Sequence, residues 1–350
     1  MTAQKRKLEH LEICLRENVE AQHNYWDDIT FEHNALPEID YDDISLETKF
    51  LGKKLEMPVI INAITGGIPE AEKYNGRFAS AAEKFGIGMG VGSQRPAFEG
   101  GDVKSYEILK AHKIPLKIAN LGAPQLIPQK KGGHVFTVED GKKAIEMIDG
   151  DVLAIHLNFL QEVVQREGDK NAKGCLAKIK EFASAMPVMV KETGAGISRG
   201  TAEKLRAAGV KAIDISGLSG TSFAKVEQYR AVLQKDYLHA VLGTTLGEWG
   251  IPSPVCVLKS RVKGLPLVAS GGIRNGMDVA RAIALGADAV GIAGALLKPA
   301  HDSQQKLERK LEAIREELKA VMFLLGVKNI EELKKVPCII VGKTKEYLEE

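Results

Sequence analysis

The fold is decided by the stretch Val268-Ala269-Ser270-Gly271-Gly272-Ile273-Arg274 and, one helix further on, by Ala289-Val290-Gly291-Ile292-Ala293-Gly294. Each is a short apolar run, typical of a buried parallel strand, that ends in glycine and other small residues. Such residues let backbone N–H groups approach an anion closely, and a helix that follows adds the partial positive charge of its N-terminus. Two consecutive strand–glycine–helix units commonly bind a phosphate in the last quarter of a (β/α)8 barrel. The sequence therefore predicts a phosphate cup here, with tight turns that bind nothing as the alternative.

Six earlier apolar runs have the same character. They are Met57–Ala63, Ile87–Val91, Pro115–Ala119, Val152–His156, Pro187–Val190 and Ala212–Ile215. Amphipathic stretches between the runs predict crossover helices, among them Ala71–Phe85, Val138–Ile148, Ser198–Ala208 and Gly276–Leu285. Eight such units predict an α/β fold, a (β/α)8 TIM barrel. A doubly wound sheet is the rival, but Thr65-Gly66-Gly67 after the first strand lacks its Gly-x-Gly-x-x-Gly turn.

The length of 350 residues allows one barrel of about 250 residues with additions at both ends. We expect residues 1–50 to form an N-terminal arm and helix that contribute to the substrate site, residues 51–302 the barrel, and residues 303–350 C-terminal helices packed on it. Leucines and isoleucines at helical spacing predict those helices at Ser303–Leu325 and Ile330–Lys334. The segment Gln234–Pro254 is glycine-rich, with Trp249 as a buried-type aromatic, and predicts a loop and barrel rim.

Composition indicates an ordinary soluble chain, with 44% hydrophobic and 27% charged residues. The net charge of +2 gives no global field that would favour nucleic acid or an acidic membrane as a partner. No apolar run reaches the roughly 18 residues of a membrane span, and MTAQKRKLEH lacks the apolar centre of a signal peptide. We therefore expect a cytoplasmic protein whose four scattered cysteines are free thiols.

Polar residues follow the predicted strands at their carboxyl ends, where the loops of a barrel build its site. They are Asn62, Thr65, Ser93, Gln94, Arg95, Asn120, His156, Asn158, Gln161, Glu162, Lys191, Glu192, Ser216 and Thr221. Lys191 ends an apolar strand and would be costly there unless it faces a ligand anion or a carboxylate such as Glu192. His156 ends another apolar strand, and it could equally be a hydrogen-bonded core residue.

An ordered set of motifs resembles the type 2, flavin-dependent isopentenyl-diphosphate isomerases along almost the whole chain. It includes Arg6-Lys7-x-x-His10, Ile61-Asn62-Ala63-Ile64-Thr65-Gly66-Gly67, Val91-Gly92-Ser93-Gln94-Arg95, Ile155-His156-Leu157-Asn158, Gln161-Glu162, Val190-Lys191-Glu192, Asp214-Ile215-Ser216-Gly217, Gly220-Thr221-Ser222-Phe223 and Ala269-Ser270-Gly271-Gly272. Small departures are Ile64, where methionine is common, and Glu248, where serine or asparagine is common.

The resemblance implies that FMN lies across the mouth of the barrel. Its phosphate would lie in the cup of Gly271, Gly272, Ile273, Ala293 and Gly294, and its other contacts would be Ala63, Ile64, Thr65, Ser93, Asn120, Lys191, Ser216 and Thr221. A cation such as Lys191 near the N1–C2 carbonyl edge would stabilise an anionic reduced flavin.

The resemblance further implies a diphosphate substrate and a magnesium ion. The matching substrate positions are Arg6, Lys7, His10, Ser93, Gln94, Arg95, Asn158 and Gln161, and Glu162 matches the Mg2+ ligand. We expect the arm that carries Arg6 and Lys7 to be mobile and to close over bound ligand. One carboxylate with diphosphate oxygens and waters suits Mg2+, which gives up its water reluctantly.

The reaction implied is the 1,3-allylic proton rearrangement of isopentenyl diphosphate to dimethylallyl diphosphate, a step of isoprenoid biosynthesis. No net redox change occurs, so NADPH or another reductant would serve only to reduce FMN. Lys191, Gln161 and His156 are the candidate catalytic residues, and whether Gln161, His156 or the flavin carries each proton stays open. The family also implies a homotetramer or homo-octamer.

An FMN-dependent oxidoreductase of the hydroxy-acid oxidase or inosinate dehydrogenase type is the alternative. Those enzymes share the barrel and the cup, but residues 216–221, Ser-Gly-Leu-Ser-Gly-Thr, contain neither the oxidases' active-site histidine nor a nucleophilic cysteine. A phosphate-binding barrel without enzymatic activity is a third reading, which would not need a buried lysine, a magnesium carboxylate and a basic arm together.

Overall fold

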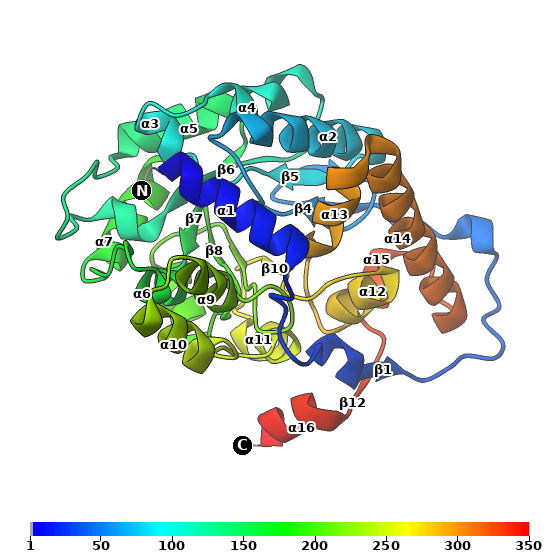
Figure 1. Cartoon of the computed structure of the whole chain (residues 1–350). Helices are drawn as coiled ribbons and strands as arrows, with labels where there is room; N and C mark the ends of the chain where they lie inside the picture. The colour runs from blue at the N-terminus through cyan, green and yellow to red at the C-terminus, as the bar shows by residue number, and fades with distance from the viewer. Residues whose placement is uncertain (1–2, 350) are drawn as a thin grey trace.

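The computed structural model describes residues 3–349 and forms one closed parallel barrel surrounded by helices (Figure 1). The barrel strands follow one another around the ring in chain order, and the last pairs with the first. They are β4 (Val59–Ile61), β5 (Gly88–Gly90), β6 (Lys117–Gly122), β7 (Val152–Leu157), β8 (Val188–Glu192), β9 (Ala212–Asp214), β10 (Leu267–Ala269) and β11 (Ala289–Ile292). All eight predicted strands are present, and the (β/α)8 prediction is confirmed.

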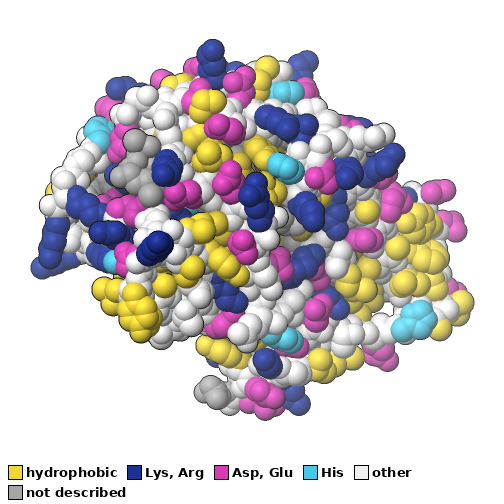
Figure 2. Space-filling model, viewed as in Figure 1, with side chains coloured by type: hydrophobic (Ala, Val, Ile, Leu, Met, Phe, Trp, Pro, Cys, Tyr) yellow, Lys and Arg dark blue, Asp and Glu magenta, His cyan; other side chains and the backbone are white. Residues whose placement is uncertain are grey.

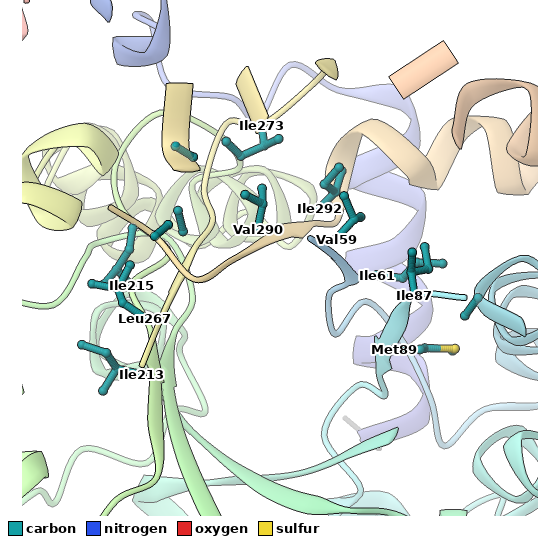
Figure 3. Packing of buried hydrophobic residues seen from close by; sticks show 14 of the residues in the cluster. Val59, Ile61, Ile87, Met89, Ile213, Ile215, Leu267, Ile273, Val290 and Ile292 are labelled. Atoms are coloured by element: carbon teal, nitrogen blue, oxygen red, sulfur yellow. The ribbon is translucent and has the colours of Figure 1, made fainter. Parts of the chain in front are cut away.

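Alternate residues along each strand belong to two different cores, as the period of two along a β-strand requires. In β7, Leu153 and Ile155 join the large cluster between strands and helices, whereas Val152 and Ala154 join the cluster inside the barrel. Figure 3 shows part of the outer cluster, with labelled side chains from β4, β5, β9, β10 and β11. Each strand is therefore buried on both faces, which is why its sequence reads as continuously apolar.

Helices cover the outside of the barrel. Those between or after strands are α2 (Pro69–Phe85), α3 (Arg95–Phe98), α4 (Lys104–Glu107), α5 (Val138–Ile148), α6 (Phe159–Val164), α7 (Cys175–Ala185), α8 (Arg199–Ala207), α9 (Phe223–Leu233), α10 (Tyr237–Leu246), α11 (Ser253–Ser260), α12 (Gly276–Ala284) and α13 (Gly294–Asp302). Short 3-10 helices lie at Ile108–Ala111 and Ala123–Leu126. The four predicted crossover helices appear as α2, α5, α8 and α12, with bounds that agree to within two residues.

The prediction of a loop at Gln234–Pro254 was wrong for Tyr237–Leu246, which form helix α10. Asp236 caps the helix by accepting a hydrogen bond from the backbone N–H of His239. Gly243 is a packing residue, since a Cβ there would overlap Gln228 and the carbonyl of Ala224 on α9. Trp249 is not buried, and 64% of its surface is exposed.

An N-terminal segment, residues 25–31, packs against a C-terminal segment, residues 338–349. The N-terminal part contains α1 (Ala3–Arg16), the 3-10 helices η1 (Tyr25–Asp28) and η2 (Tyr41–Asp43), and strands β1 (Ile29–Phe31), β2 (Thr48–Phe50) and β3 (Lys53–Leu55); the C-terminal part contains α14 (Gln304–Leu325), α15 (Ile330–Leu333), β12 (Cys338–Ile340) and α16 (Gly342–Glu349). The C-terminal helices were predicted, but the antiparallel pairing of β1 with β12 was not. Residues 1–2 of the predicted arm and residue 350 of the predicted C-terminal segment lie outside the described residues.

Two predictions from composition can be compared with the structure. All four cysteines, Cys14, Cys175, Cys256 and Cys338, are free thiols. Within residues 3–349, none of the helices combines the length and the apolar character needed to cross a membrane.

The hairpin of β2 and β3 supplies part of the barrel interior. Phe50 exposes only 2% of its surface, and it packs with Leu55 in the cluster of inward-facing strand residues. We expect Phe50→Ala to lower the free energy of unfolding by about 3–5 kcal/mol, because it leaves a cavity in a close-packed core. Urea unfolding followed by circular dichroism measures this, with Leu36→Ala, at a site 72% exposed, as a control expected to change by less than about 0.5 kcal/mol. Equal losses in the two variants would contradict the role of the hairpin.

Candidate active site

One cavity of about 480 Å³ lies at the carboxyl ends of the strands, beneath helix α1. In Figure 1, α1 crosses the mouth of the barrel. The cavity wall brings together predicted residues from both ends of the chain: Arg6, Lys7, His10, Ala63, Ile64, Thr65, Ser93, Arg95, Asn120, His156, Asn158, Gln161, Glu162, Lys191, Ser216, Thr221, Gly271, Gly272, Ile273, Ala293 and Gly294. The structure has the N-terminal arm already over the mouth, and its predicted mobility stays a prediction.

A layer of polar side chains closes the barrel directly beneath this cavity. On six strands, the residue two positions beyond an apolar interior residue is polar. These polar residues are Asn62, Asn120, His156, Lys191, Asp214 and Ser270. Asn62 Nδ2 donates to Asp214 Oδ2 at 2.7 Å, and Ser270 donates to the same carboxylate. His156 Nδ1 lies 2.8 Å from Asn120 Oδ1. Hydrogen bonds between adjacent strands, and between β4 and β9, thus satisfy most of a buried polar floor, as burial requires.

Two titratable residues of this layer have distinct environments. Burial lowers the pKa of His156 to about 3, and the charges of Lys191 and Lys7 act in the same direction. Lys191 Nζ donates to the backbone carbonyl of Glu192 at 2.8 Å. The Glu192 carboxylate instead accepts backbone N–H groups of the following loop, from Thr193 at 2.6 Å and Gly194 at 2.7 Å. The floor therefore combines a lysine with a neutral imidazole.

The glycine turn after β10 has the geometry of an anion site. Gly271 and Gly272 have φ of +86° and +85°, and a Cβ on either would overlap the carbonyls of Gly217 and Ser219. Glycine is thus required at both positions. No partner is found among residues 3–349 for the backbone N–H groups of Gly272 and Ile273.

Two further features keep this turn accessible to an anion. A Cβ at Gly220, across the turn, would collide with the nitrogen of Gly272. The N-terminus of α13 at Gly294 also lines the cavity, and the N–H of Gly294 has no partner within the described chain. Unpaired N–H groups on a concave turn beside a helix N-terminus fit a phosphate.

Helix α1 places cations at another part of the wall. Lys7 Nζ donates to the carbonyl of Gly66, to that of Ser93 at 2.8 Å and to Tyr106 Oη at 3.2 Å. Burial lowers the pKa of Lys7 to about 7, and the adjacent Arg6 contributes in the same direction. Three neutral oxygens orient this amine but do not neutralise its charge, so the position suits an added anion.

The two arginines differ in how their charge is compensated. Arg95 forms ion pairs of 2.7 Å with both Glu99 and Asp169. Within residues 3–349, Arg6 has only a longer contact, 3.9 Å, to Glu167. Of the two guanidinium groups on the wall, that of Arg6 therefore has the less compensated charge.

Glu162 and Asn158 form an oxygen-rich corner. The Glu162 carboxylate accepts Asn158 Nδ2 at 3.0 Å and the backbone N–H of Asp169 at 2.7 Å, and burial is the main cause that raises its pKa. Asn158 Oδ1 is buried and has no hydrogen-bond partner in the described part of the chain. An unpaired oxygen beside a carboxylate fits a cation that takes oxygen ligands. Residues 3–349 contain no cluster of three or more His, Cys, Asp or Glu arranged around a metal position.

Glu227 and Arg230 on α9 lie behind the cavity wall, where Glu227 contacts His10 and Gln161, and the sequence did not reveal them. Glu227 is 2% exposed, and it accepts His10 Nε2 at 2.8 Å and Gln161 Nε2 at 2.9 Å. Burial alone would raise the pKa of Glu227, but His10 and Arg230 lower it to about 2. This carboxylate joins α1 to Gln161 and fixes the amide of Gln161. Acidic and basic side chains at helical spacing are typical of a solvated helix face. The i,i+3 spacing of Glu227 and Arg230 was the only sign in the sequence that the two could form an ion pair.

Gln94 is the one predicted site residue that the structure does not bring to the cavity wall. Its side chain is completely buried on the other side of the strand end, where Nε2 donates to the carbonyl of Ala144 at 2.8 Å. Its Oε1 accepts the backbone N–H of Asn120, also at 2.8 Å. Gln94 therefore supports β6, and we leave it out of the substrate-binding set.

We expect His156 to remain neutral well below pH 6, because its pKa is lowered to about 3. Acidification from about pH 6.5 toward pH 3 should then favour the unfolded state, which takes up a proton that the folded state does not. Histidine 15N NMR of the flavin-free protein between pH 7 and pH 4 should show one neutral imidazole throughout. The His156→Gln variant assigns that signal by its loss, and titration of the signal near pH 6.5 would contradict the environment described.

Comparisons with known proteins place this geometry in a family. Residues 160–339 match the model for FMN-dependent dehydrogenase. By structure, a flavocytochrome b2 variant with benzoylformate has a TM-score of 0.65 at 18% identity, covering 97% of this chain and 87% of that one. A mandelate oxidase variant has a TM-score of 0.62 at 15% identity, covering 95% of each chain. At these identities, the two structures show a shared fold.

Similarity in sequence is much higher for another group of proteins. The isopentenyl-diphosphate delta-isomerase of Thermoplasma volcanium is 46% identical over 347 residues, 99% of both chains. The protein of the same name from Archaeoglobus fulgidus is 43% identical over 353 residues, covering 100% of this chain and 99% of the relative. The chain therefore belongs to the FMN-dependent, type 2 family of isopentenyl-diphosphate delta-isomerases.

Proposed function

We propose that this protein converts isopentenyl diphosphate to dimethylallyl diphosphate by a 1,3-allylic proton rearrangement that requires reduced FMN and Mg2+. The observation that carries the proposal is that one cavity contains two separate anion positions. The cup at Gly272 and Gly294 suits the phosphate of a flavin, and the cations of α1 suit the diphosphate of a substrate. Relatives of this name along the whole chain support that pairing of ligands.

Flavin binding is proposed for the cup and the polar floor. Gly271, Gly272, Ile273, Ala293 and Gly294 would hold the FMN phosphate, and Ala63, Ile64, Thr65, Ser93, Asn120, Lys191, Ser216 and Thr221 would surround the rest of the cofactor. When bound in its reduced form, FMN supplies a group able to exchange protons with an allylic carbon, and NADPH would serve only to reduce it. Lys191 contributes positive charge at the floor, which favours an anionic form of the cofactor.

The residues around the substrate are proposed to bind, orient and dehydrate. An alkene is a poor base, so its protonation needs a donor held close in a dry pocket, and α1 covers the mouth for this purpose. The neutral His156 is a poor candidate for that donor, because a pKa of about 3 leaves it without a second proton at neutral pH. Gln161, fixed by Glu227, does not titrate and is better suited to orient the allylic carbons.

Magnesium is proposed at the corner of Glu162 and Asn158. A carboxylate and a free amide oxygen supply protein ligands, and the diphosphate and water would supply the others. His10, Ser93, Arg95, Arg6 and Lys7 complete the proposed substrate-binding set. A diphosphate near Lys7 would favour its protonated form, so substrate binding would restore the charge that burial disfavours.

We also propose that copies of the chain assemble into a homotetramer or homo-octamer. Figure 2 shows hydrophobic side chains gathered over α10 on the surface. The exposed apolar residues of α9 and α10 are Val232, Leu233, Tyr237, Leu238 and Val241. None of these five residues lines the cavity, and an exposed apolar patch of this kind supports contact with another copy of the chain.

An FMN-dependent oxidoreductase is the second candidate function. The match of residues 160–339 to the FMN-dependent dehydrogenase model favours it. The two candidates differ in electron balance, because an oxidoreductase consumes one reducing or oxidising equivalent pair per product and an isomerase consumes none.

Turnover with a count of electrons tests the proposed function. The protein with FMN, Mg2+, isopentenyl diphosphate and a small amount of NADPH should produce the two allylic methyl signals of dimethylallyl diphosphate in proton NMR. Product should exceed the NADPH consumed many times over. Consumption of one NADPH per product, or peroxide release from 2-hydroxy acids without any isomerisation, would favour the second candidate.

Arg6→Ala should weaken the apparent affinity for isopentenyl diphosphate by about tenfold or more, because charge-assisted hydrogen bonds contribute about 1.5–3 kcal/mol each. Bound FMN per protein chain should stay unchanged. Steady-state kinetics and the flavin absorbance of the purified variant measure the two effects. Arg16→Ala is the matched control, since Arg16 is exposed at the end of the same helix. Wild-type affinity in the Arg6 variant would show that this arginine does not bind the substrate.

A further inference from the structure

Trp26 is a completely buried tryptophan that lies behind the phosphate cup rather than on the cavity wall. It belongs to η1, far from the cup in sequence, and its indole Nε1 donates to the carbonyl of Gly271 at 2.8 Å. Ser253 Oγ donates to the same carbonyl, also at 2.8 Å. Two donors therefore hold one peptide oxygen of the cup on the side away from the cavity.

The planarity of the peptide bond makes this contact matter for the cup. In a trans peptide, the C=O and the N–H point in opposite directions. Fixing the Gly271 carbonyl toward Trp26 and Ser253 therefore directs the Gly272 N–H the other way, toward the cavity that Gly272 lines. The same arrangement occurs one residue later, where the Arg274 guanidinium donates to the Gly272 carbonyl. This contact directs the Ile273 N–H toward the cavity as well.

Fixation is needed because glycine does not hold this orientation by itself. Gly271 and Gly272 both have positive φ, and glycine populates positive and negative φ about equally. Without an external partner, the Gly271–Gly272 peptide could rotate and present its carbonyl to an anion. A donor behind the turn removes that freedom.

Contacts of residues 25–31 with the C-terminal segment hold Trp26 in place. Asp28, two residues later, accepts His23 Nε2 at 3.0 Å, the backbone N–H of Thr344 at 2.9 Å and the Thr344 hydroxyl at 2.8 Å. The antiparallel pairing of β1 with β12 extends this contact. The C-terminal segment is thus connected to the cup through η1.

We propose that Trp26 is a positioning residue for the phosphate site, and that the C-terminal segment contributes to cofactor retention through it. The proposal rests on the proposed function, because it takes the FMN phosphate as the occupant of the cup. It adds a role for a residue that makes no contact with the cavity, and for a terminus at the opposite end of the chain.

Titration of flavin-free full-length protein with FMN and with riboflavin tests the proposal, because riboflavin lacks the phosphate. Trp26→Phe keeps the buried ring but removes the N–H donor. Its FMN affinity should fall by about three- to tenfold, as expected for one lost buried hydrogen bond, and its riboflavin affinity should not change. Trp249→Phe, at the exposed second tryptophan, is the matched control and should bind both flavins as the wild type does.

Two more variants extend the test. Trp26→Phe combined with Ser253→Ala leaves the Gly271 carbonyl without either donor, and the loss of FMN affinity should exceed that of each single variant. Thr344→Val removes the hydroxyl contact to Asp28, and we expect a smaller loss that is again specific to FMN. Unchanged FMN affinity in Thr344→Val would overturn the contribution of the C-terminal segment.

The outcomes separate this inference from the proposed function. Preferential binding of FMN over riboflavin by the wild type, with no change in Trp26→Phe, would overturn the role of Trp26 alone. An equal loss for both flavins in Trp26→Phe would also overturn it, because the effect would then not act through the phosphate. Equal affinity of the wild type for FMN and riboflavin would overturn the placement of the phosphate in the cup, and the inference with it.

Discussion

The fold and the site both depend on the alternation of side chains between the two faces of each of the eight parallel strands. Strands of a closed barrel end together at one rim, so the inward positions just past the apolar interior must all face the same space. In this chain those positions include Asn62, Asn120, His156, Lys191 and Asp214. Their hydrogen bonds to one another form a polar floor under a covered cavity. Fold and site are thus consequences of one alternation, with apolar residues below and polar residues above.

The cavity above this floor has positive character in two places, and it arises by different means. At the cup the positive character comes from backbone N–H groups whose direction is fixed from behind by Trp26 and Arg274. Under α1 it comes from side-chain cations, one of which, Lys7, has its pKa lowered to about 7 by burial and by the neighbouring charge of Arg6. Such a lysine is costly without a counter-charge. The buried lysine therefore favours the binding of an anionic ligand, which supports a diphosphate as substrate.

Local patterns predicted what local residues determine. The strands, four crossover helices and the glycine turn after β10 were predicted from apolar runs, helical spacing and the glycines that follow the strand, and the structure contains them all. Long-range contacts left little signal. Glu227 reads as part of a solvated helix face, and only the fold brings His10 to it. The pairing of β1 with β12 joins two short segments from opposite ends of the chain. Gln94 was predicted to line the cavity and does not, because a position at a strand end does not determine on which side of the strand the side chain lies.

A crystal structure of the reduced holoenzyme with isopentenyl diphosphate would test the central claim, the separation of the two anion positions, most directly. The account predicts the FMN phosphate against the backbone N–H groups of Gly272, Ile273 and Gly294. It predicts the substrate diphosphate against Arg6 and Lys7 beneath α1. A diphosphate bound in the glycine cup, or one bound with Arg6 and Lys7 turned away from it, would contradict the account.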